Sequence, residues 1–496
     1  MAGRFHLAAI VGLALAISMA LTAVSQGQGK GGGGKPPKDD DNTPPAAVTD
    51  LIITEVTADS ITLMWTATGD DGTTGTGTSY DIRYLAGEGI TDENWDAADQ
   101  EKDEPAPQVA GSSESFTVYL LPDTTYYLRL KVADEVPNFS DLSNEVSATT
   151  LTGPWSIEVV DREGNVGFSN SLAYDPVDGN PSIAYGRRAS PPKGEGAQLQ
   201  FAHWNGSSWD IEVVEPGPSG SGVNLAYDPI DGAPTIAYLA SGDLKFARRS
   251  AASWEIETVD KRIALGVSLA YDLNENPSIS YRKKAKGAWD LNFARWNGTG
   301  WDIEVVEAGA LARYNNLTFD PSGNPAIAYS DISEGGTFYD TLKFAEWNPV
   351  TETWDIEILK TDTAKSVGRM DLEYDGAGKP TIVHRSKPCI AIVQRQADGT
   401  WTDEIVDCGT TNAFDANLEF DSTGTAFVAY DALMDTDHED ETRLATLGPL
   451  GWEIETVDRH GGFAGRISLV LDPDELPSFS HGEPDNGDLK FARKNP

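Results

Sequence analysis

A tryptophan followed by an alternation of acidic and apolar residues occurs seven times between residue 155 and the end of this 496-residue chain. The seven tryptophans are Trp155, Trp209, Trp254, Trp301, Trp354, Trp401 and Trp452, spaced 45 to 54 residues apart. Periods of roughly 40–50 residues that hold several short strands are typical of β-propeller blades. The repeats therefore predict seven blades.

Each repeat divides into four strand-like pieces, which in the fourth repeat are residues 301–306, 316–320, 325–329 and 342–347. In the second piece, leucine and an aromatic residue alternate with small residues, so its bulky face can pack on a small face of the neighbouring blade. The tryptophan piece alternates apolar residues with Asp and Glu. This pattern predicts an outermost strand with one face in water.

The order of the pieces predicts how the ring closes. The repeat region opens with an outer-type strand at Trp155 and ends with the strand at residues 489–493, so the last repeat lacks an outer strand. Pairing these two strands completes the seventh blade and removes two exposed sheet edges. We expect an all-β fold in which residues 155–496 form a seven-bladed β-propeller closed by its N-terminal strand.

Residues 45–150 show short strands separated by turn residues, with alternating apolar positions at 61–65 and 80–84. This segment resembles the fibronectin type III family in its core Trp65, in Tyr80-x-Ile82-x-Tyr84, in the Leu120-to-Tyr126 corner and in residues 143–149. The resemblance implies a β-sandwich that acts as a spacer. The long segment 85–115 departs from the family pattern and is expected to lie along the sandwich edge.

The repeats themselves resemble the degenerate propeller repeats of secreted bacterial proteins related in shape to sialidases and sugar-binding propellers. The recurring form is Leu-Ala-Tyr-Asp, then Pro-x-Ile-Ala-Tyr, then Leu-Lys-Phe-Ala-x-Trp-Asn-Gly. The resemblance is to an architecture, and propellers host many functions. The Asp box of sialidases is absent from the sequence, as are zinc-type histidine spacing and a Gly-x-Ser-x-Gly elbow. No catalytic residue is assigned, and a non-enzymatic protein is favoured.

The N-terminal residues predict export. Arg4 precedes the apolar run 7–21 and the small residues 23–25, so residues 1–25 read as a signal peptide and 26–44 as a flexible Gly/Pro/Asp linker. No later apolar run is long enough for a membrane span. We expect a secreted or periplasmic monomer. The excess of 78 acidic over 37 basic residues, a formal charge of -41, argues against nucleic acid and anionic lipid as partners.

An aspartate ends the second piece of every repeat, just before a turn. These residues are Asp175, Asp228, Asp272, Asp320, Asp375, Asp421 and Asp472. A ring of seven carboxylates suggests a metal, but an aspartate entering a turn accepts hydrogen bonds from the following amides. We favour this structural role.

The loops that vary between repeats carry the candidate ligand-binding residues, because the conserved turns occupy the opposite face. The candidates are Arg187, Arg188, Arg282, Lys283, Arg313, Arg369 and Arg385. Such a face can bind a charged polysaccharide, and the alternative is a charged surface that is only solvated. In the sixth repeat Asp435, Asp437 and Glu439 alternate as Ca²⁺ ligands do, although the loop lacks the glycine and the terminal glutamate of an EF-hand; the alternative is a solvated acidic loop. No other cofactor is expected.

Cys389 and Cys408 flank the Asp398-Gly399 turn symmetrically. They should face each other across one hairpin, and export to an oxidising compartment favours a disulfide.

The leading functional hypothesis is a secreted, non-enzymatic binding or scaffold protein whose variable face contacts a glycan or a protein. One alternative is a degenerate glycoside hydrolase or polysaccharide lyase, favoured if carboxylates and arginines of several blades converge near the channel mouth. The other is a purely structural surface protein.

Overall fold

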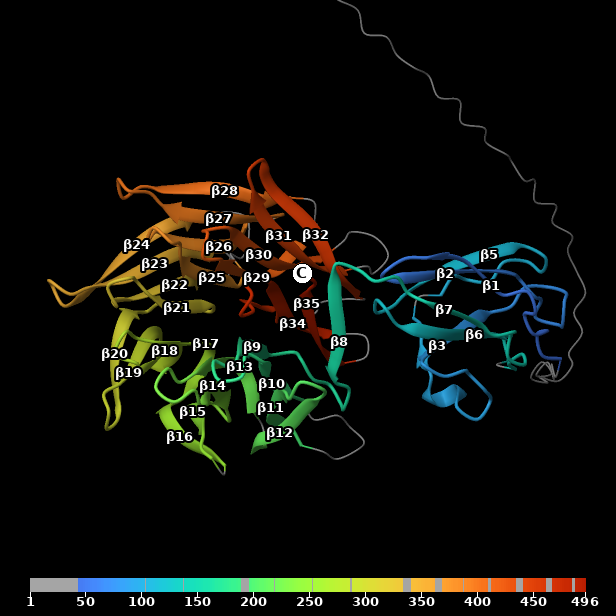
Figure 1. Ribbon diagram of the computed structural model, residues 1–496, viewed down its shortest axis with the longest axis horizontal. Helices are drawn as coiled ribbons and strands as arrows, with labels where there is room; N and C mark the ends of the chain where they lie inside the picture. The colour runs from blue at the N-terminus through green and yellow to red at the C-terminus, as the bar shows by residue number, and fades with distance from the viewer. Residues whose placement is uncertain are drawn as a thin grey trace, which may run out of the picture. The chain divides into compact units, whose positions relative to one another are not determined.

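The computed structural model describes residues 43–496 except 103, 137, 189–195, 218, 252, 286–287, 333–339, 362–367, 387, 409–411, 434–439, 461–465 and 484–486. The described residues form 35 strands and one three-residue 3-10 helix (Figure 1). None of the described helical segments is long and apolar enough to cross a membrane. The expected signal peptide and nearly all of the expected linker lie outside the described residues.

The N-terminal domain is a two-sheet sandwich. One sheet has the order β1-β2-β5 and the other the order β4-β3-β6-β7. The strands are β1 (Ile52–Val56), β2 (Ser60–Thr66), β3 (Ser79–Ala86), β4 (Asp99–Gln100), β5 (Ser113–Tyr119), β6 (Thr125–Ala133) and β7 (Val146–Thr149). Trp65 is buried and meets Tyr80 edge-on, with ring centroids 5.0 Å apart. The Tyr126 hydroxyl accepts a hydrogen bond from the Leu121 amide, which forms the expected corner.

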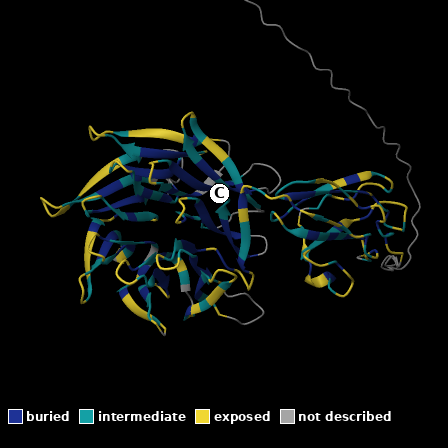
Figure 2. Cartoon of the chain, in the orientation of Figure 1, coloured by how far each residue is buried: buried dark blue, intermediate teal, exposed yellow. Residues whose placement is uncertain are grey.

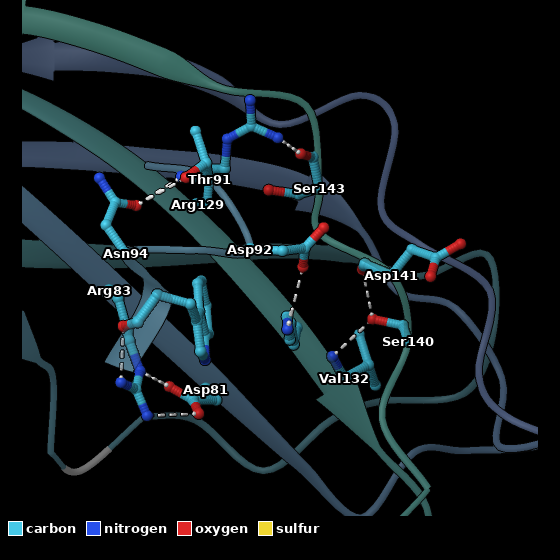
Figure 3. A network of polar contacts seen from close by, with 12 residues as sticks. Asp81, Arg83, Thr91, Asp92, Asn94, Arg129, Val132, Ser140, Asp141 and Ser143 are labelled. Carbon is cyan, nitrogen blue, oxygen red and sulfur yellow. Dashed lines mark hydrogen bonds and ion pairs between the residues drawn. The ribbon is translucent and has the colours of Figure 1, made fainter. Parts of the chain in front are cut away.

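The segment between β3 and β5 folds back on the sandwich edge, as expected. Its strand β4 pairs with β3, and its 3-10 helix η1 (Trp95–Ala97) carries a buried tryptophan. The Arg83 guanidinium and the Lys131 ammonium lie 4.8 and 4.7 Å from the Trp95 ring centroid. Arg83 is held by Asp81 and by the Trp95 carbonyl, and Lys131 is paired with Asp92 (Figure 3). These contacts fix the insertion on the sheet.

The C-terminal region consists of seven four-stranded antiparallel sheets, numbered here from sheet 1 to sheet 7. Sheet 1 comprises β9 (Asn170–Tyr174), β10 (Pro181–Arg187), β11 (Gln198–Trp204) and β12 (Trp209–Pro216). Sheet 2 comprises β13 (Ser219–Tyr227), β14 (Pro234–Ala240), β15 (Asp243–Arg249) and β16 (Trp254–Lys261). Sheet 3 comprises β17 (Ile263–Tyr271), β18 (Pro277–Ala285), β19 (Ala288–Trp296) and β20 (Trp301–Ala308). Sheet 4 comprises β21 (Asn315–Phe319), β22 (Pro325–Ile332), β23 (Asp340–Asn348) and β24 (Thr353–Thr361).

Sheets 5 and 6 follow the same plan, with the strands β25 (Met370–Tyr374), β26 (Pro380–Ser386), β27 (Cys389–Arg395), β28 (Trp401–Asp407), β29 (Asn412–Phe420), β30 (Ala426–Leu433), β31 (Asp440–Gly448) and β32 (Gly451–His460). Sheet 7 comprises β33 (Ser468–Leu471), β34 (Pro477–Glu483), β35 (Asp488–Lys494) and β8 (Trp155–Asp161). Strand β8 therefore pairs with β35, as the strand order predicts, with Ile157 opposite Ala492. In Figure 1 the teal strand β8 stands beside the red strands of sheet 7.

The first strand of each sheet contacts the first strand of the next. The contacting pairs are β9 with β13, β13 with β17, β17 with β21, β21 with β25, β25 with β29, β29 with β33, and β33 with β9. Figure 1 shows these strands towards the middle of the region and the fourth strands at its outside. The contacts between first strands thus run through all seven sheets and return to β9.

The repeated tryptophans join neighbouring outer strands. Six of them donate an indole N–H hydrogen bond to the glutamate of the preceding sheet: Trp209 to Glu158, Trp254 to Glu212, Trp301 to Glu257, Trp354 to Glu304, Trp401 to Glu357 and Trp452 to Glu404. In these six pairs the acceptor is the glutamate three residues after the tryptophan of the preceding sheet. The first of these bonds links sheet 1 to sheet 7.

The expectation that the outer strands have one face in water is wrong, because both faces are partly exposed. The apolar residues Ile211 and Val305 are 40% and 50% exposed, and Asp210 on the other face is exposed as well. The exposed residues concentrate on the outer strands (Figure 2). Since the first strands lie against one another in the middle, neighbouring sheets diverge outwards and leave room for water on both sides.

A second set of hydrogen bonds joins each second strand to the end of the outer strand of the preceding sheet. A tyrosine of the second strand donates its hydroxyl to a carboxylate of the preceding sheet's outer strand: Tyr185 to Asp161, Tyr238 to Glu215, Tyr281 to Asp260, Tyr329 to Glu307 and Tyr430 to Asp407. Burial, followed by the negative charge of the acceptor, raises the pKa of Tyr185 far above its ordinary value. These buried or partly buried bonds link each of these sheets to the one before it.

Cys389 and Cys408 form the predicted disulfide, with their Cα atoms 4.1 Å apart. The bridge spans the hairpin between β27 and β28, whose turn contains Asp398 and Gly399. A disulfide fits an oxidising compartment.

Candidate functional site

The loops that enter the first strands place one residue of each sheet at an equivalent position, three residues before the strand's leucine. From sheet 1 to sheet 7 these residues are Ser169, Gly222, Gly266, Tyr314, Arg369, Asp415 and Arg466. Sheets 1 to 3 have small residues here, whereas sheets 4 to 7 have long polar ones. We call Tyr314, Arg369, Asp415 and Arg466, together with the neighbouring Arg282 and Arg313, the rim cluster.

Asp415 forms an ion pair with Arg369 of the rim cluster. It is 2% exposed, accepts the amide of Ile467, and lies 3.2 Å from Nη1 of Arg369. Arg466 donates from Nη1 to the Val223 carbonyl at 2.6 Å and from Nη2 to Oδ1 of Asn224 at 3.3 Å. Burial, followed by the positive charge of Arg369, lowers the pKa of Arg466 to about 10. Arg369 and Arg466 thus lie close enough to repel each other, and of the two only Arg369 has an ion pair among the described residues.

Arg282 has no carboxylate partner among the described residues. Its side chain is 8% exposed, its Nη1 donates to the Leu311 carbonyl at 2.9 Å, and its Nε has no hydrogen-bond partner. Burial, followed by the positive charge of Arg313, lowers the pKa of Arg282. Arg313 is exposed and has no ion pair within the described parts of the chain. Among the described residues, the two guanidinium groups therefore form a positively charged site with no carboxylate beside them.

Aromatic rings separate and support these cations. The guanidinium carbons of Arg313 and Arg369 lie 5.4 and 5.8 Å from the Tyr314 ring centroid. The guanidinium of Arg282 lies 4.4 Å from the Trp289 ring centroid. Contact with an aromatic face stabilises a cation by about 0.5–2 kcal/mol and holds it in one orientation.

Trp289, whose ring Arg282 contacts, lines a cavity of about 540 Å³. Its lining is Ser241, Gly242, Asp243, Arg262, Ile263, Lys284 and Trp289, from sheets 2 and 3. The Lys284 ammonium lies 5.4 Å from the Trp289 ring centroid. The cavity therefore presents an aromatic ring flanked by basic groups, and it extends the basic character of the rim cluster.

The residues directly before the leucines form a second layer that ties each first strand to the next. Five of them accept the leucine amide of the following sheet: Ser171 from Leu225, Ser268 from Leu317, Asp371 from Leu418, Asn417 from Leu469 and Ser468 from Leu172. Asp371 also accepts from Asn316 at 2.5 Å. Burial raises the pKa of Asp371 to about 6. Both carboxylate oxygens of Asp371 are used within the fold.

Two glutamates form a third layer, directly after the leucines. Sheets 5 and 6 have Glu373 and Glu419 at this position, where the other sheets have Ala173, Ala226, Ala270, Thr318 and Val470. Burial, followed by the negative charge of Asp371, raises the pKa of Glu419 to about 8. Burial and then the charges of Glu419 and Asp371 raise the pKa of Glu373 well above its ordinary value. Neither glutamate has an ion pair among the described residues.

Glu419→Gln is expected to stabilise the protein at alkaline pH. The unfolded carboxyl ionises near its ordinary pKa and the folded one near pH 8, so stability falls as the pH rises through that interval. Glutamine removes this loss, and after allowance for partial exposure we expect a gain of about 2–3 kcal/mol at pH 8 and little change at pH 5. Urea unfolding at both pH values measures it, with Glu255→Gln on an exposed outer strand as the control. Equal midpoints for Glu419→Gln and the native protein at pH 8 would refute the assignment.

The structure brings together only some of the predicted basic residues. Arg282, Arg313 and Arg369 belong to the rim cluster, as described above. Arg187 lies 3.8 Å from Glu163, Arg188 stacks on Phe168 and Lys283 is paired with Asp260, so these three are placed elsewhere. Arg385 is buried in β26. Asp435, Asp437 and Glu439 lie outside the described residues.

Sequence reasoning missed Tyr314, Asp415 and Arg466. Their common signal is their register, since each precedes the leucine of a first strand by three residues. Aligning the repeats on that leucine would have shown the change from small residues in sheets 1 to 3 to long polar residues in sheets 4 to 7.

The seven turn aspartates have the favoured structural role. In each, Oδ1 accepts the amide two residues later, as Asp175 does from Val177 at 2.7 Å and Asp320 from Ser322 at 2.8 Å. The other members accept from Ile230, Asn274, Ala377, Thr423 and Asp474.

Residues 46–149 match the model of the fibronectin type III domain family. Residues 46–149 form a fibronectin type III domain. The domain carries the insertion around Trp95 described above. No curated protein sequence matches the chain.

Several solved structures resemble the chain at low identity. An ulvan lyase of the polysaccharide lyase class is 12% identical, covers 66% of this chain and 94% of its own, with a TM-score of 0.47. AofleA from Arthrobotrys oligospora is 13% identical over 63% of this chain and 92% of its own, with a TM-score of 0.41. A leech intramolecular trans-sialidase is 11% identical over 90% and 96%, with a TM-score of 0.40. Scores this low carry no argument about function.

Proposed function

We propose that this is a secreted glycan-binding protein in which residues 155–496 form a closed seven-bladed β-propeller and the rim cluster binds an acidic polysaccharide. The fibronectin type III domain serves as the spacer. The returning series of first-strand contacts and the pairing of β8 with β35 support the closed ring. The rim cluster then surrounds one end of its central channel.

The observation that carries the proposed ligand class is the uncompensated charge of Arg282 and Arg313. The protein has 78 acidic side chains, yet these two arginines have no carboxylate partner among the described residues. Burial, followed by the positive charge of Arg313, lowers the pKa of Arg282. A bound carboxylate or sulfate would relieve this repulsion, and arginine binds such groups through two parallel hydrogen bonds.

The neighbouring rings suit a sugar polymer. Tyr314 and Trp289 offer aromatic faces on which the apolar face of a sugar can pack, while their polar edges remain hydrated. The cavity beside Trp289 gives room for a further residue of the polymer.

The net charge of -41 does not prevent this binding. Salt at physiological strength screens exposed charges beyond about 8 Å, so the distant acidic surface contributes little at the rim. Binding of an acidic polymer therefore depends on the charges close to it, which at the rim cluster include the arginines.

Binding of the full-length protein to polygalacturonate, chondroitin sulfate and dextran sulfate, with dextran as the neutral control, tests the proposal. We expect saturable binding to at least one acidic polymer, weakened by salt, and none to dextran. Absence of binding to all three acidic polymers, or equal binding to dextran, would contradict it.

One observation favours a second candidate, an acid-assisted polysaccharide lyase or hydrolase. Arginines and carboxylates of several sheets do converge at the rim. However, both oxygens of Asp371 bind backbone or side-chain donors of the fold. Glu373 lies four residues beyond Arg369, roughly 13 Å along an extended strand. Release of unsaturated uronate or of reducing ends from the bound polymer would establish this activity in place of simple binding.

A further inference from the structure

Strand β11 carries a histidine, beside the turn at the end of β9, at a position where sheets 2, 3 and 7 have an arginine. His203 on β11 stands opposite Ser182, one residue after the proline that begins β10. In the same register Arg248 stands opposite Thr235, and Arg493 stands opposite Ser478. The three residues therefore occupy one structural position.

In sheets 2 and 7 this arginine lies between two carboxylates of the turn. Arg248 bonds through Nε to Asp228 at 3.2 Å and through Nη2 to Asp231 at 2.5 Å. Arg493 is paired in the same way with Asp472 at 2.6 Å and with Asp474 at 3.4 Å. A permanent positive charge thus balances each carboxylate pair.

Sheet 1 keeps the two carboxylates and lacks the permanent charge. Nε2 of His203 lies 3.1 Å from Oδ2 of Asp178, and Asp175 is the other member of the pair. One ligand atom from each of Asp175, Asp178 and His203 lies within 4.8 Å of the others. Unlike a guanidinium, an imidazole has a ring nitrogen with a lone pair that can bind a metal ion.

We propose that Asp175, Asp178 and His203 bind a divalent transition-metal ion of the Zn²⁺ type. One imidazole nitrogen and two carboxylate oxygens are a ligand set that Zn²⁺ accepts, with water completing the coordination. The charge of the ion replaces the guanidinium found in sheets 2 and 7.

The surroundings of His203 support this role. Its Nδ1 lies 2.8 Å from the Ser182 hydroxyl, which in turn contacts the Tyr227 hydroxyl at 2.6 Å. Such an outer partner orients a metal-binding imidazole and leaves Nε2 to the ion. Each carboxylate also has Oδ1 held by a turn amide, Val177 for Asp175 and Asn180 for Asp178, and Oδ2 of Asp178 faces Nε2 of His203. Asp178 is 42% exposed, which gives the ion access.

Calorimetric titration of the untagged full-length protein with Zn²⁺, in excess Ca²⁺ to fill oxygen-only sites, tests the inference. The native protein is expected to bind one equivalent through this site. His203→Arg restores the ion pairs of sheets 2 and 7, so it should remain folded and lose that equivalent. With Co²⁺ as the probe, the visible absorption band of a nitrogen-containing site should disappear in the same variant.

A reciprocal variant sharpens the test. Arg248→His places an imidazole between Asp228 and Asp231 and is expected to add one equivalent of Zn²⁺. Absence of Zn²⁺ binding by the native protein, or an unchanged stoichiometry in His203→Arg, would overturn the site. No gain in Arg248→His would overturn the role given to the paired carboxylates.

Discussion

Arg313→Ala is expected to weaken binding of an acidic polysaccharide by about 10- to 100-fold, because a hydrogen bond to a charged group contributes about 1.5–3 kcal/mol. The Arg313 side chain is exposed and forms no ion pair among the described residues, so the substitution should leave the thermal unfolding midpoint unchanged. Affinity measured by titration with the acidic polymer that binds the native protein gives the comparison.

Lys379→Ala provides the matched control. Lys379 is also a basic residue without an ion pair in the described part of the chain, but it lies in the turn after β25, at the other ends of the strands. We expect it to leave affinity within about twofold, since screened charges beyond about 8 Å contribute little. Equal losses in both variants would show that binding depends on total charge and not on the rim cluster.

Trp155→Ala is expected to destabilise the repeat region by about 3–5 kcal/mol, the usual cost of removing a large buried aromatic side chain. Trp155 is 3% exposed, its ring centroid lies 5.0 Å from that of Phe479 in β34, and its strand supplies the outer edge of sheet 7. Urea unfolding with separate probes for the two domains measures this loss.

Trp65→Ala is the corresponding control in the other domain. Trp65 lies in the core of the fibronectin type III domain, so its loss should lower the stability of that domain and spare the repeat region. If Trp155→Ala cost less than about 1 kcal/mol, β8 would not be an integral strand of sheet 7.

The sequence pattern predicts the sheets well where a residue acts within its own repeat or at a fixed place in the next one. The tryptophans, the aspartate turns and the paired cysteines are of this kind, because their partners lie at a constant register. The pairing of β8 with β35 follows from counting strand types alone.

The rim cluster could be predicted only in part, because its members meet across sheets. Arg466 reaches Val223 over a separation of 243 residues, and nothing in the local sequence of either residue indicates that contact. Arg187 and Arg282 both lie towards the end of a second strand, yet the former faces a glutamate and the latter faces Trp289. Arg187 lies two residues after the tyrosine of its strand and Arg282 only one, so their side chains point to opposite faces of their sheets.

Hydrogen–deuterium exchange of the full-length protein, with and without the acidic polysaccharide that it binds, tests the central proposal most directly. If the rim cluster binds the polymer, we expect slowed exchange at residues 309–316, at residues 368–371 and around Trp289, with no change at the turns after the first strands. Protection confined to those turns or to the fibronectin type III domain would place the ligand elsewhere and contradict the proposed role of the rim cluster.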